Sequence, residues 1–317
     1  MNPVTGLNYK AHKLVQEMIG RADELRCTVI SSPTEATLID CGFQTTGSLE
    51  AGMHLARICL SDLGQVALRP GNLPGCPLIE VSSHQPVLAC LASQYAGWQL
   101  QITNYFAMAS GPMRAAYARE PLYSVLNYRE QSEIAVGILE AKDLPTAEVL
   151  LDIANKCHVP PKGLFLLAAP TTSLAGTLQV VARSVETALH KLHELQFDLN
   201  TIISAYGTAP LPPVARKTSY AIGNTNDAIL YGGDVTLWVR CDEEVLDALG
   251  PQVPASASRD YGLPFAQLLE RAGGDFYQID PLLFSPARIT FHNLQTGRSH
   301  TFGQLNLPFL EKNWGLI

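Results

Sequence analysis

The chain has 317 residues, of which 47% are hydrophobic and 16% are charged, and its formal net charge is −7. This length suffices for two hydrophobic cores of ordinary domain size. The negative charge and the lack of any Lys/Arg run or basic–aromatic patch argue against nucleic acid as a partner. No segment approaches the about 18–20 apolar residues of a membrane span or resembles a secretory leader. We therefore expect a cytoplasmic protein with no membrane partner.

Seven cysteines occur singly, at positions 27, 41, 59, 76, 90, 157 and 241. They form no C-x-x-C pair and no even framework of the kind found in disulfide-rich secreted domains. We expect reduced, partly buried thiols. The charged fraction is below the about 25% of an average domain, which indicates a mesophile protein rather than a hyperthermophile one.

Helical and strand patterns alternate along the first half of the chain. Helical spacing is present in residues 7–26, 49–60, 86–95 and 147–156. Strand patterns are present in residues 27–31, 36–41, 65–68, 78–82, 98–103 and 133–139. This alternation predicts an α/β fold of mixed α+β layers, in which helices cover sheets.

The second half of the chain also contains both helical and strand patterns. Residues 201–206 are expected to form a strand that leads into a proline-rich connector, 207–213. Residues 228–231 and 235–239 are expected to form a hairpin turned by Gly232 and Gly233, which the polar segment 223–227 precedes. Two helices, 244–249 and 265–272, and a hairpin over 288–302 complete the pattern. We place a domain boundary near residues 140–145, which gives an N-terminal α/β domain of residues 1–143 and a C-terminal one of residues 144–317.

A central stretch, residues 163–195, combines a buried strand, a polar turn and a long helix. Its strand is the continuous apolar run 164–169, which Pro170 ends, and the hydroxyls of Thr171 and Ser173 can cap the helix that follows. In open α/β sheets ligands bind at this end of the strands, because helix N-termini present unpaired N–H groups there. Thr171 and Ser173 are therefore candidate substrate-binding residues.

On the helix of this stretch, Arg183, Glu186 and His190 lie opposite an apolar stripe that begins at Val181. One interpretation is a solvated face with an i,i+3 ion pair that contributes about 0.2–0.5 kcal/mol. The other is a cleft wall, where a carboxylate kept ionised by a neighbouring cation can activate water. The residues alone leave both open. His190 and His193 lack the spacing of zinc-binding helices, so we expect no metal site.

Two further groups could contact a flat ligand. Tyr105 and Phe106 fall in an expected loop after a strand, where they could stack on a ring or simply pack inward. Asn224, Asn226 and Asp227 precede an expected strand, where they could bind the amide-like edge of a ligand or form an Asx turn. No motif for nicotinamide binding, nucleotide hydrolysis or serine-esterase chemistry is present.

Several blocks, in order along nearly the whole chain, carry a resemblance to a known family. They are Ile39–Gly42, Gly97–Gln99, Asn104–Met108, Ala169–Ser173, Ala182–Thr187, Gly207–Pro210, Thr225–Gly233, Asp260–Gly262 and Phe284–Arg288. Together they resemble methenyltetrahydromethanopterin cyclohydrolase. Their number and order make the match more specific than any single block.

This resemblance implies an enzyme of one-carbon metabolism that reversibly hydrolyses the methenyl bridge of a reduced pterin carrier to the 5-formyl derivative, without metal or other cofactor. It implies a homotrimer whose subunits have two α/β domains flanking a large pocket, and it assigns catalysis to Arg183 and Glu186. The low charge content favours formaldehyde oxidation in a bacterial methylotroph over methanogenesis. Two alternatives are a non-catalytic pterin-binding carrier or regulatory protein and a cyclohydrolase acting on a folate.

Overall fold

The computed structural model describes residues 6–274 and 278–316. The chain divides into two compact units, each built from two separate segments: Met1–Leu63 with Leu88–Gln179, and Gly64–Val87 with Val180–Ile317. Within the described residues, each unit contains one six-stranded mixed sheet, which confirms the predicted α/β class. No helix in these two described ranges is long and apolar enough to cross a membrane.

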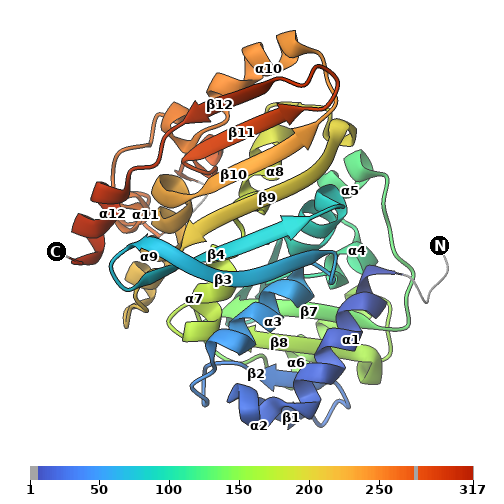
Figure 1. The fold of residues 1–317 in the computed structure, drawn as a ribbon. Coiled ribbons are helices and arrows are strands. Elements are labelled where there is room, and N and C mark those ends of the chain that lie inside the picture. The colour runs from blue at the N-terminus through green and yellow to red at the C-terminus, as the bar shows by residue number, and fades with distance from the viewer. Residues whose placement is uncertain (1–5, 275–277, 317) are drawn as a thin grey trace. The chain divides into compact units, whose positions relative to one another are not determined.

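The sheet of the first unit has the strand order β1-β2-β8-β7-β6-β5 (Figure 1). Its strands are β1 (Thr28–Ser31), β2 (Thr37–Asp40), β5 (Trp98–Ile102), β6 (Tyr105–Ser110), β7 (Ala135–Ala141) and β8 (Leu164–Ala169). Strands β2, β8 and β7 run parallel, and β1, β6 and β5 pair antiparallel towards the two edges. The central strands β7 and β8 are covered on both faces, which explains their continuous apolar sequences.

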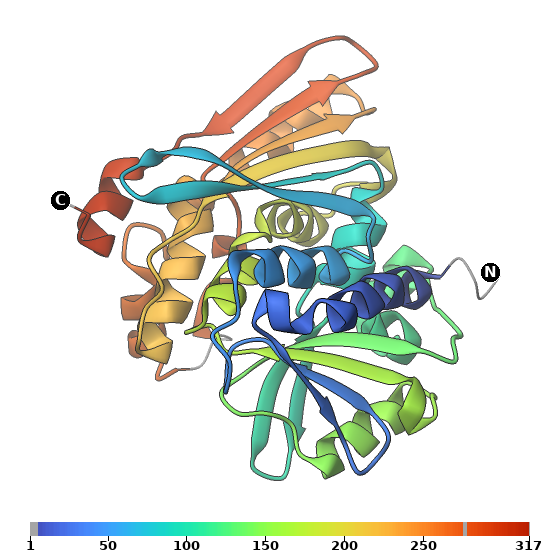
Figure 2. The same ribbon diagram turned by 60° about the horizontal axis from the view of Figure 1, so that its bottom comes forward.

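Helices cover both faces of this sheet (Figure 2). The α-helices of this unit are α1 (Leu7–Gly20), α2 (Ala22–Leu25), α3 (Leu49–Cys59), α4 (Met113–Tyr117), α5 (Pro121–Leu126), α6 (Ala147–Lys156) and, up to Gln179, α7 (Leu174–Val181). On one face Leu14 of α1 and Leu55 of α3 share a core with Ile138 of β7. On the other face Ile153 of α6 packs in a core with Leu166 of β8. The first unit is therefore a three-layer α/β/α arrangement.

A π-helix, Val87–Gln94, occupies the place of the helix predicted over residues 86–95. Fully buried Arg114 donates from Nη1 to the carbonyl oxygens of Leu91 and Ser93, at 3.2 and 3.1 Å, and pairs with Glu120. These donors satisfy carbonyl groups of the helix within the core, where an unpaired carbonyl would be costly.

The sheet of the second unit has the order β12-β11-β10-β9-β4-β3 (Figure 1). Its strands are β3 (Gly64–Leu73), β4 (Cys76–Ser83), β9 (Ile202–Pro210), β10 (Asp234–Val239), β11 (Arg288–Asn293) and β12 (Ser299–Gly303). Its helices include α8 (Ser184–Glu194), α9 (Thr218–Gly232), α10 (Glu243–Leu249), α11 (Phe265–Arg271) and α12 (Leu307–Trp314). Only the β10–β11 pair is parallel among these described strands.

Helix α9 overturns part of the prediction for the second unit. The first strand of the predicted hairpin, residues 228–231, lies in this helix together with the polar residues 223–227, and only the second predicted strand is present, as β10. A Cβ on Gly223 would lie 2.8 Å from the side chain of Ala266 in α11. Close packing against α11 and α12 therefore outweighs the poor helical propensity of the Asn, Thr and Gly residues in this segment.

Two strands also differ from expectation. Tyr105 and Phe106 begin β6 instead of lying in a loop, because the turn is confined to residues 103–104 and β6 pairs directly with β5. Strand β9 extends through Pro210, so the first half of the predicted connector is part of the sheet.

The two units do not contain the same residues as the two domains predicted with a boundary at residue 143. Residues 144–179 belong to the first unit because β8 pairs with both β2 and β7. Residues 64–87 belong to the second unit because β4 pairs with β9. Strand pairing between segments distant in sequence thus determines which residues form each unit.

Candidate active site

The long helix predicted after residue 173 is broken into α7 and α8. Arg183 is the N-cap residue of α8, with φ −103° and ψ 12°, and its carbonyl oxygen accepts a 2.9 Å hydrogen bond from the Thr187 amide. Glu186 lies in the first turn of α8. The partial positive charge at a helix N-terminus favours a carboxylate at this position.

Arg183 and Glu186 are both buried, with relative exposures of 7% and 5%. The interpretation of this helix face as solvated surface is therefore wrong. Burying a guanidinium and a carboxylate is costly, and charged groups held in such surroundings are concentrated at functional sites. Their spacing of three residues places both on one side of α8.

The opposite side of α8 fixes this helix on the sheet of the second unit. Val185, Ala188, Leu189 and Leu192 are fully buried, as the apolar stripe predicts, and α8 packs against β9 and β10 (Figure 1). A Cβ on Gly207 of β9 would lie 2.8 Å from Ser184 Oγ and from Val185 Cγ2. Gly207 therefore allows the first turn of α8, which carries Glu186, to approach the strand closely.

Thr171 and Ser173 lie in the first unit, between β8 and α7. Ser173 Oγ donates to the Pro170 carbonyl oxygen at 2.8 Å and accepts from the Gly176 amide at 3.0 Å, which confirms its predicted capping of the following helix. Thr171 Oγ1 donates to Glu140 Oε1 at the end of β7. These contacts hold the turn at the carboxyl ends of two parallel strands, where α/β sheets bind ligands.

Tyr105 and Phe106 point to opposite faces of β6, because successive side chains alternate along a strand. Tyr105 belongs to the core beneath α6, and its hydroxyl group has no hydrogen-bond partner within the described chain. Burial raises the pKa of this hydroxyl well above its usual value. Phe106 is 46% exposed. The two rings therefore do not form a single stacking surface.

Asn224, Asn226 and Asp227 lie on α9, so the Asx-turn interpretation is wrong. Asp227 Oδ1 accepts from the Phe265 amide at 2.9 Å, and Oδ2 accepts from Asn313 Nδ2 at 2.7 Å. Burial raises the pKa of Asp227 to about 7. Asp227 thus connects α9 to the start of α11 and to α12. Asn226 Nδ2 donates to the Ile222 carbonyl oxygen of its own helix at 2.8 Å.

Three residues near these positions were not singled out from the sequence. Glu140 follows a buried strand pattern, and its carboxylate at a strand end was a usable signal. Gly207 was assigned to the connector, but it lies inside β9, where a glycine often marks a close approach of another element. Lys191 had no signal: it lies on α8, its Nζ donates to the Leu282 carbonyl oxygen, and burial lowers its pKa to about 8.

His190 and His193 of α8 lie close to side chains of their own helix. His190 Nε2 lies 3.6 Å from Glu194 Oε1, and its ring centroid is 6.5 Å from that of His193. Over residues 6–274 and 278–316, no group of three or more His, Cys, Asp or Glu side chains is placed to hold a metal ion.

An α/β protein that buries a carboxylate and a guanidinium at the start of one helix has the groups expected of a hydrolase that activates water. The family model described as "Cyclohydrolase (MCH)" matches residues 6–314, and the chain belongs to this family.

Similar proteins named methenyltetrahydromethanopterin cyclohydrolase come from several organisms. The chain is 47% identical to that of Rhodopirellula baltica over 289 residues, covering 89% of this chain and 86% of the relative. It is 46% identical to that of Xanthobacter autotrophicus over 304 residues, with coverages of 95% and 90%. Identity to the protein of Methanosarcina barkeri is 39% over 315 residues, with 98% of both chains covered.

Proposed function

We propose that this protein reversibly hydrolyses the methenyl bridge of 5,10-methenyltetrahydromethanopterin, or of its dephospho form, to the 5-formyl derivative. The observation that carries this proposal is the family match over residues 6–314, together with relatives of that name at 39–47% identity over nearly their whole length. The buried Arg183 and Glu186 supply side chains suited to the reaction.

The chemistry needs only a few groups. The methenyl carbon lies between two nitrogens in a delocalised cation and is already electrophilic, so the enzyme has to position a water molecule and remove its proton as the C–O bond forms. We assign this base role to Glu186. Arg183 would keep the carboxylate ionised and orient it. After attack, protonated Glu186 can return its proton to the departing nitrogen.

The substrate contacts are proposed residue by residue. Thr171 and Ser173 follow the carboxyl ends of parallel strands, where α/β sheets commonly bind ligands. Asn224 and Asn226 present amides on α9, and Phe106 offers an exposed ring. Tyr105 and Asp227, also predicted from the sequence, are weaker candidates, because both are buried in contacts within their own units.

Three further features follow from the family resemblance. We propose that turnover needs neither metal nor organic cofactor, that the active form is a homotrimer, and that the protein acts in the cytoplasm. The electrophilic substrate supports the first of these, since its carbon needs no Lewis acid before water attacks.

The decisive experiment follows the loss of the methenyl chromophore with the methanopterin-type and folate-type carriers. We expect rapid hydrolysis of the methanopterin-type substrate and slow or no hydrolysis of the folate. Preferred hydrolysis of the folate would contradict the proposed substrate. Tight binding of either methenyl compound without turnover would instead support a non-catalytic pterin-binding protein.

A further inference from the structure

Two cysteines face each other where the β1–β2 ladder ends. The antiparallel register pairs Thr28 with Asp40, so one further step places Cys27 opposite Cys41. Residues directly opposed in such ladders have Cα atoms about 4.5–5.5 Å apart, and a disulfide requires about 4.4–6.8 Å. The backbone therefore has the spacing that a cross-strand disulfide needs.

The side chains also meet. Cys27 and Cys41 belong to the same hydrophobic core, on the face of the sheet covered by α1 and α3. The two thiols interact through their side chains, and this contact lowers the pKa of Cys27. The same contact and burial raise the pKa of Cys41. Both residues are free thiols.

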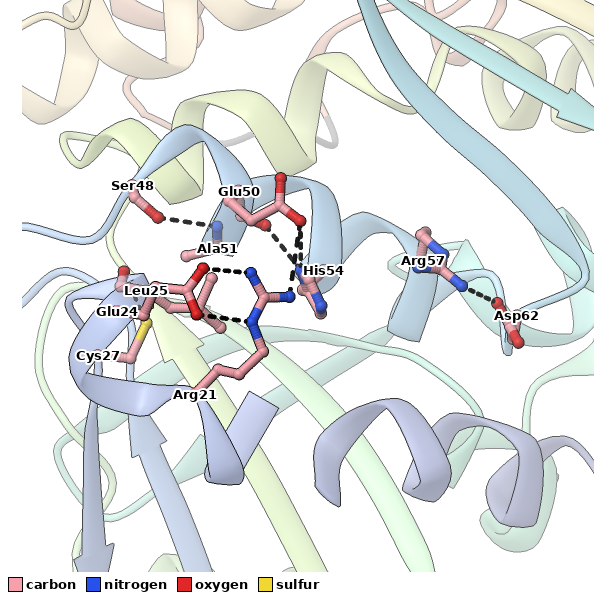
Figure 3. Close-up of polar contacts among 10 residues, drawn as sticks. All are labelled: Arg21, Glu24, Leu25, Cys27, Ser48, Glu50, Ala51, His54, Arg57 and Asp62. Carbon is pink, nitrogen blue, oxygen red and sulfur yellow. Dashed lines mark hydrogen bonds and ion pairs between the residues drawn. The ribbon is translucent and has the colours of Figure 1, made fainter. Parts of the chain in front are cut away.

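The two sulfurs differ in accessibility. Cys27 is 5% exposed and precedes the edge strand β1, whereas Cys41 is 0% exposed. Cys27 Sγ lies 3.6 Å from the Leu25 carbonyl oxygen (Figure 3), and Cys41 Sγ lies 3.7 Å from that of Ile39. Because the thiolate is the reactive nucleophile, Cys27 should react with an oxidant before Cys41 does.

The surrounding backbone holds both cysteines in place. The Asp40 carboxylate accepts hydrogen bonds from the amides of Gly42, Phe43 and Gln44 at 2.7–2.8 Å. The Gly47 amide, at the end of this loop, donates to the Arg26 carbonyl oxygen at 3.1 Å. The residues flanking the two cysteines are thus tied to each other, and bringing the sulfurs together requires no refolding.

We propose that Cys27 and Cys41 are a redox-active dithiol that closes reversibly into an intramolecular disulfide, with a hydroperoxide as the oxidant. The Cys27 thiolate attacks a peroxide oxygen, the O–O bond breaks, and hydroxide leaves and takes up the proton that Cys27 released on ionisation. With hydrogen peroxide the products are Cys27 sulfenic acid and one water. The Cys41 sulfur then attacks the sulfenic sulfur, the S–O bond breaks, and hydroxide leaves with the thiol proton as a second water. Both sulfurs are oxidised and both peroxide oxygens are reduced. An external dithiol reverses the bond by exchange.

The test treats the reduced, folded full-length protein with hydrogen peroxide. We expect the mass to fall by two hydrogen atoms, the free-thiol count to fall by two, and peptide mapping to recover Cys27 joined to Cys41. Dithiothreitol should restore both thiols. The proposal is overturned if the parent protein keeps all seven thiols, if the disulfide joins other cysteines, or if it forms only after urea unfolds the chain.

Single variants separate the two roles. Cys41→Ala should let Cys27 sulfenic acid accumulate, to be trapped by dimedone, whereas Cys27→Ala should leave Cys41 unmodified. The matched control is Cys157→Ala, because this buried thiol of the same unit donates to the Met113 carbonyl oxygen at 3.6 Å; it should form the Cys27–Cys41 disulfide as the parent does. Loss of disulfide formation in the Cys157 variant, with its melting temperature unchanged, would contradict the assignment.

Discussion

Glu186 lies buried in the first turn of α8, where the helix N-terminus favours its ionised form. A positioned general base contributes roughly 10²–10⁴-fold to a rate. Glutamine keeps the shape of the side chain but cannot take a proton, so Glu186→Gln should lose activity by about that factor while still folding and binding substrate. Turnover, substrate affinity and melting temperature should be measured on one preparation.

The matched control is Glu194→Gln, on the exposed end of the same helix, which should turn over like the parent. Near-parental turnover of Glu186→Gln, or a loss of folding large enough to account for its inactivity, would remove Glu186 as the base.

The guanidinium of Arg183 combines charge with a planar set of donors. Lysine keeps the charge but not the planar geometry, so Arg183→Lys should retain a small part of the activity and Arg183→Ala much less. The values of kcat and KM for both variants should be compared with those of Arg298→Lys, a substitution at an exposed position. Equal activity in all of them would show that Arg183 takes no part in turnover.

Individual side chains were predictable from the sequence only where a local pattern fixes them. The cap at Ser173 and the apolar side of α8 followed from turn chemistry and helical period. The burial of Arg183 and Glu186 could not be predicted in this way, because an i,i+3 pair has the same sequence pattern on a solvated helix face and on a buried one. The two contacts of Asp227, with Phe265 and Asn313, depend on packing that no local pattern encodes.

The contact between α8 and β9 depends on the missing side chain of Gly207. An added methyl group would overlap Ser184 and Val185, and overpacking costs about 1–3 kcal/mol. Gly207→Ala should therefore lower the melting temperature and, by displacing the first turn of α8, also lower turnover. The double variant Gly207→Ala/Val185→Ala should recover part of the lost melting temperature and part of the lost turnover.

Gly20→Ala is the control for this experiment, since a Cβ there meets open space; it should leave turnover unchanged. If Gly207→Ala keeps full activity, close packing on β9 is not what positions Glu186.

Asp227 connects three helices through a carboxyl group whose pKa burial raises from 3.8 to about 7. Between those pH values the folded protein keeps a proton that the unfolded chain has released, so the stability of the folded state should fall as pH rises through this window and level off above about 7. Asp227→Asn should remove this dependence. The melting temperature of Asp227→Asn should therefore rise relative to that of the parent as pH rises from 4 to 7.

The exposed substitution Asp23→Asn should follow the parent at every pH. A parent-to-Asp227→Asn difference that stays constant from pH 4 to 8 would contradict a raised pKa at this carboxyl.

Elements with a strong period were predictable, including β8, α6 and the β11–β12 hairpin. Helix α9 was not, because its Asn, Thr and Gly residues favour turns locally and become helical only through packing against α11 and α12. The break between α7 and α8 was also missed, because the apolar period continues through it.

The protein as a whole should turn over without a bound metal. The electrophilic substrate carbon supports this expectation. Exhaustive chelation should leave turnover unchanged, and metal analysis of the treated protein should verify that no metal remains. Stoichiometric zinc, whose removal abolishes activity and whose return restores it, would contradict the proposed mechanism.

The chain passes from one unit to the other between residues 63 and 64, 87 and 88, and 179 and 180. The β3–β4 hairpin is therefore synthesised before most of the first unit, and its partner β9 emerges only after that unit is complete. During translation the edge of β4 stays unpaired until β9 has been synthesised, and unpaired strand edges tend to pair with other chains. Neither unit can be produced as an uninterrupted fragment of the gene, so separating them requires a circularly permuted or spliced coding sequence.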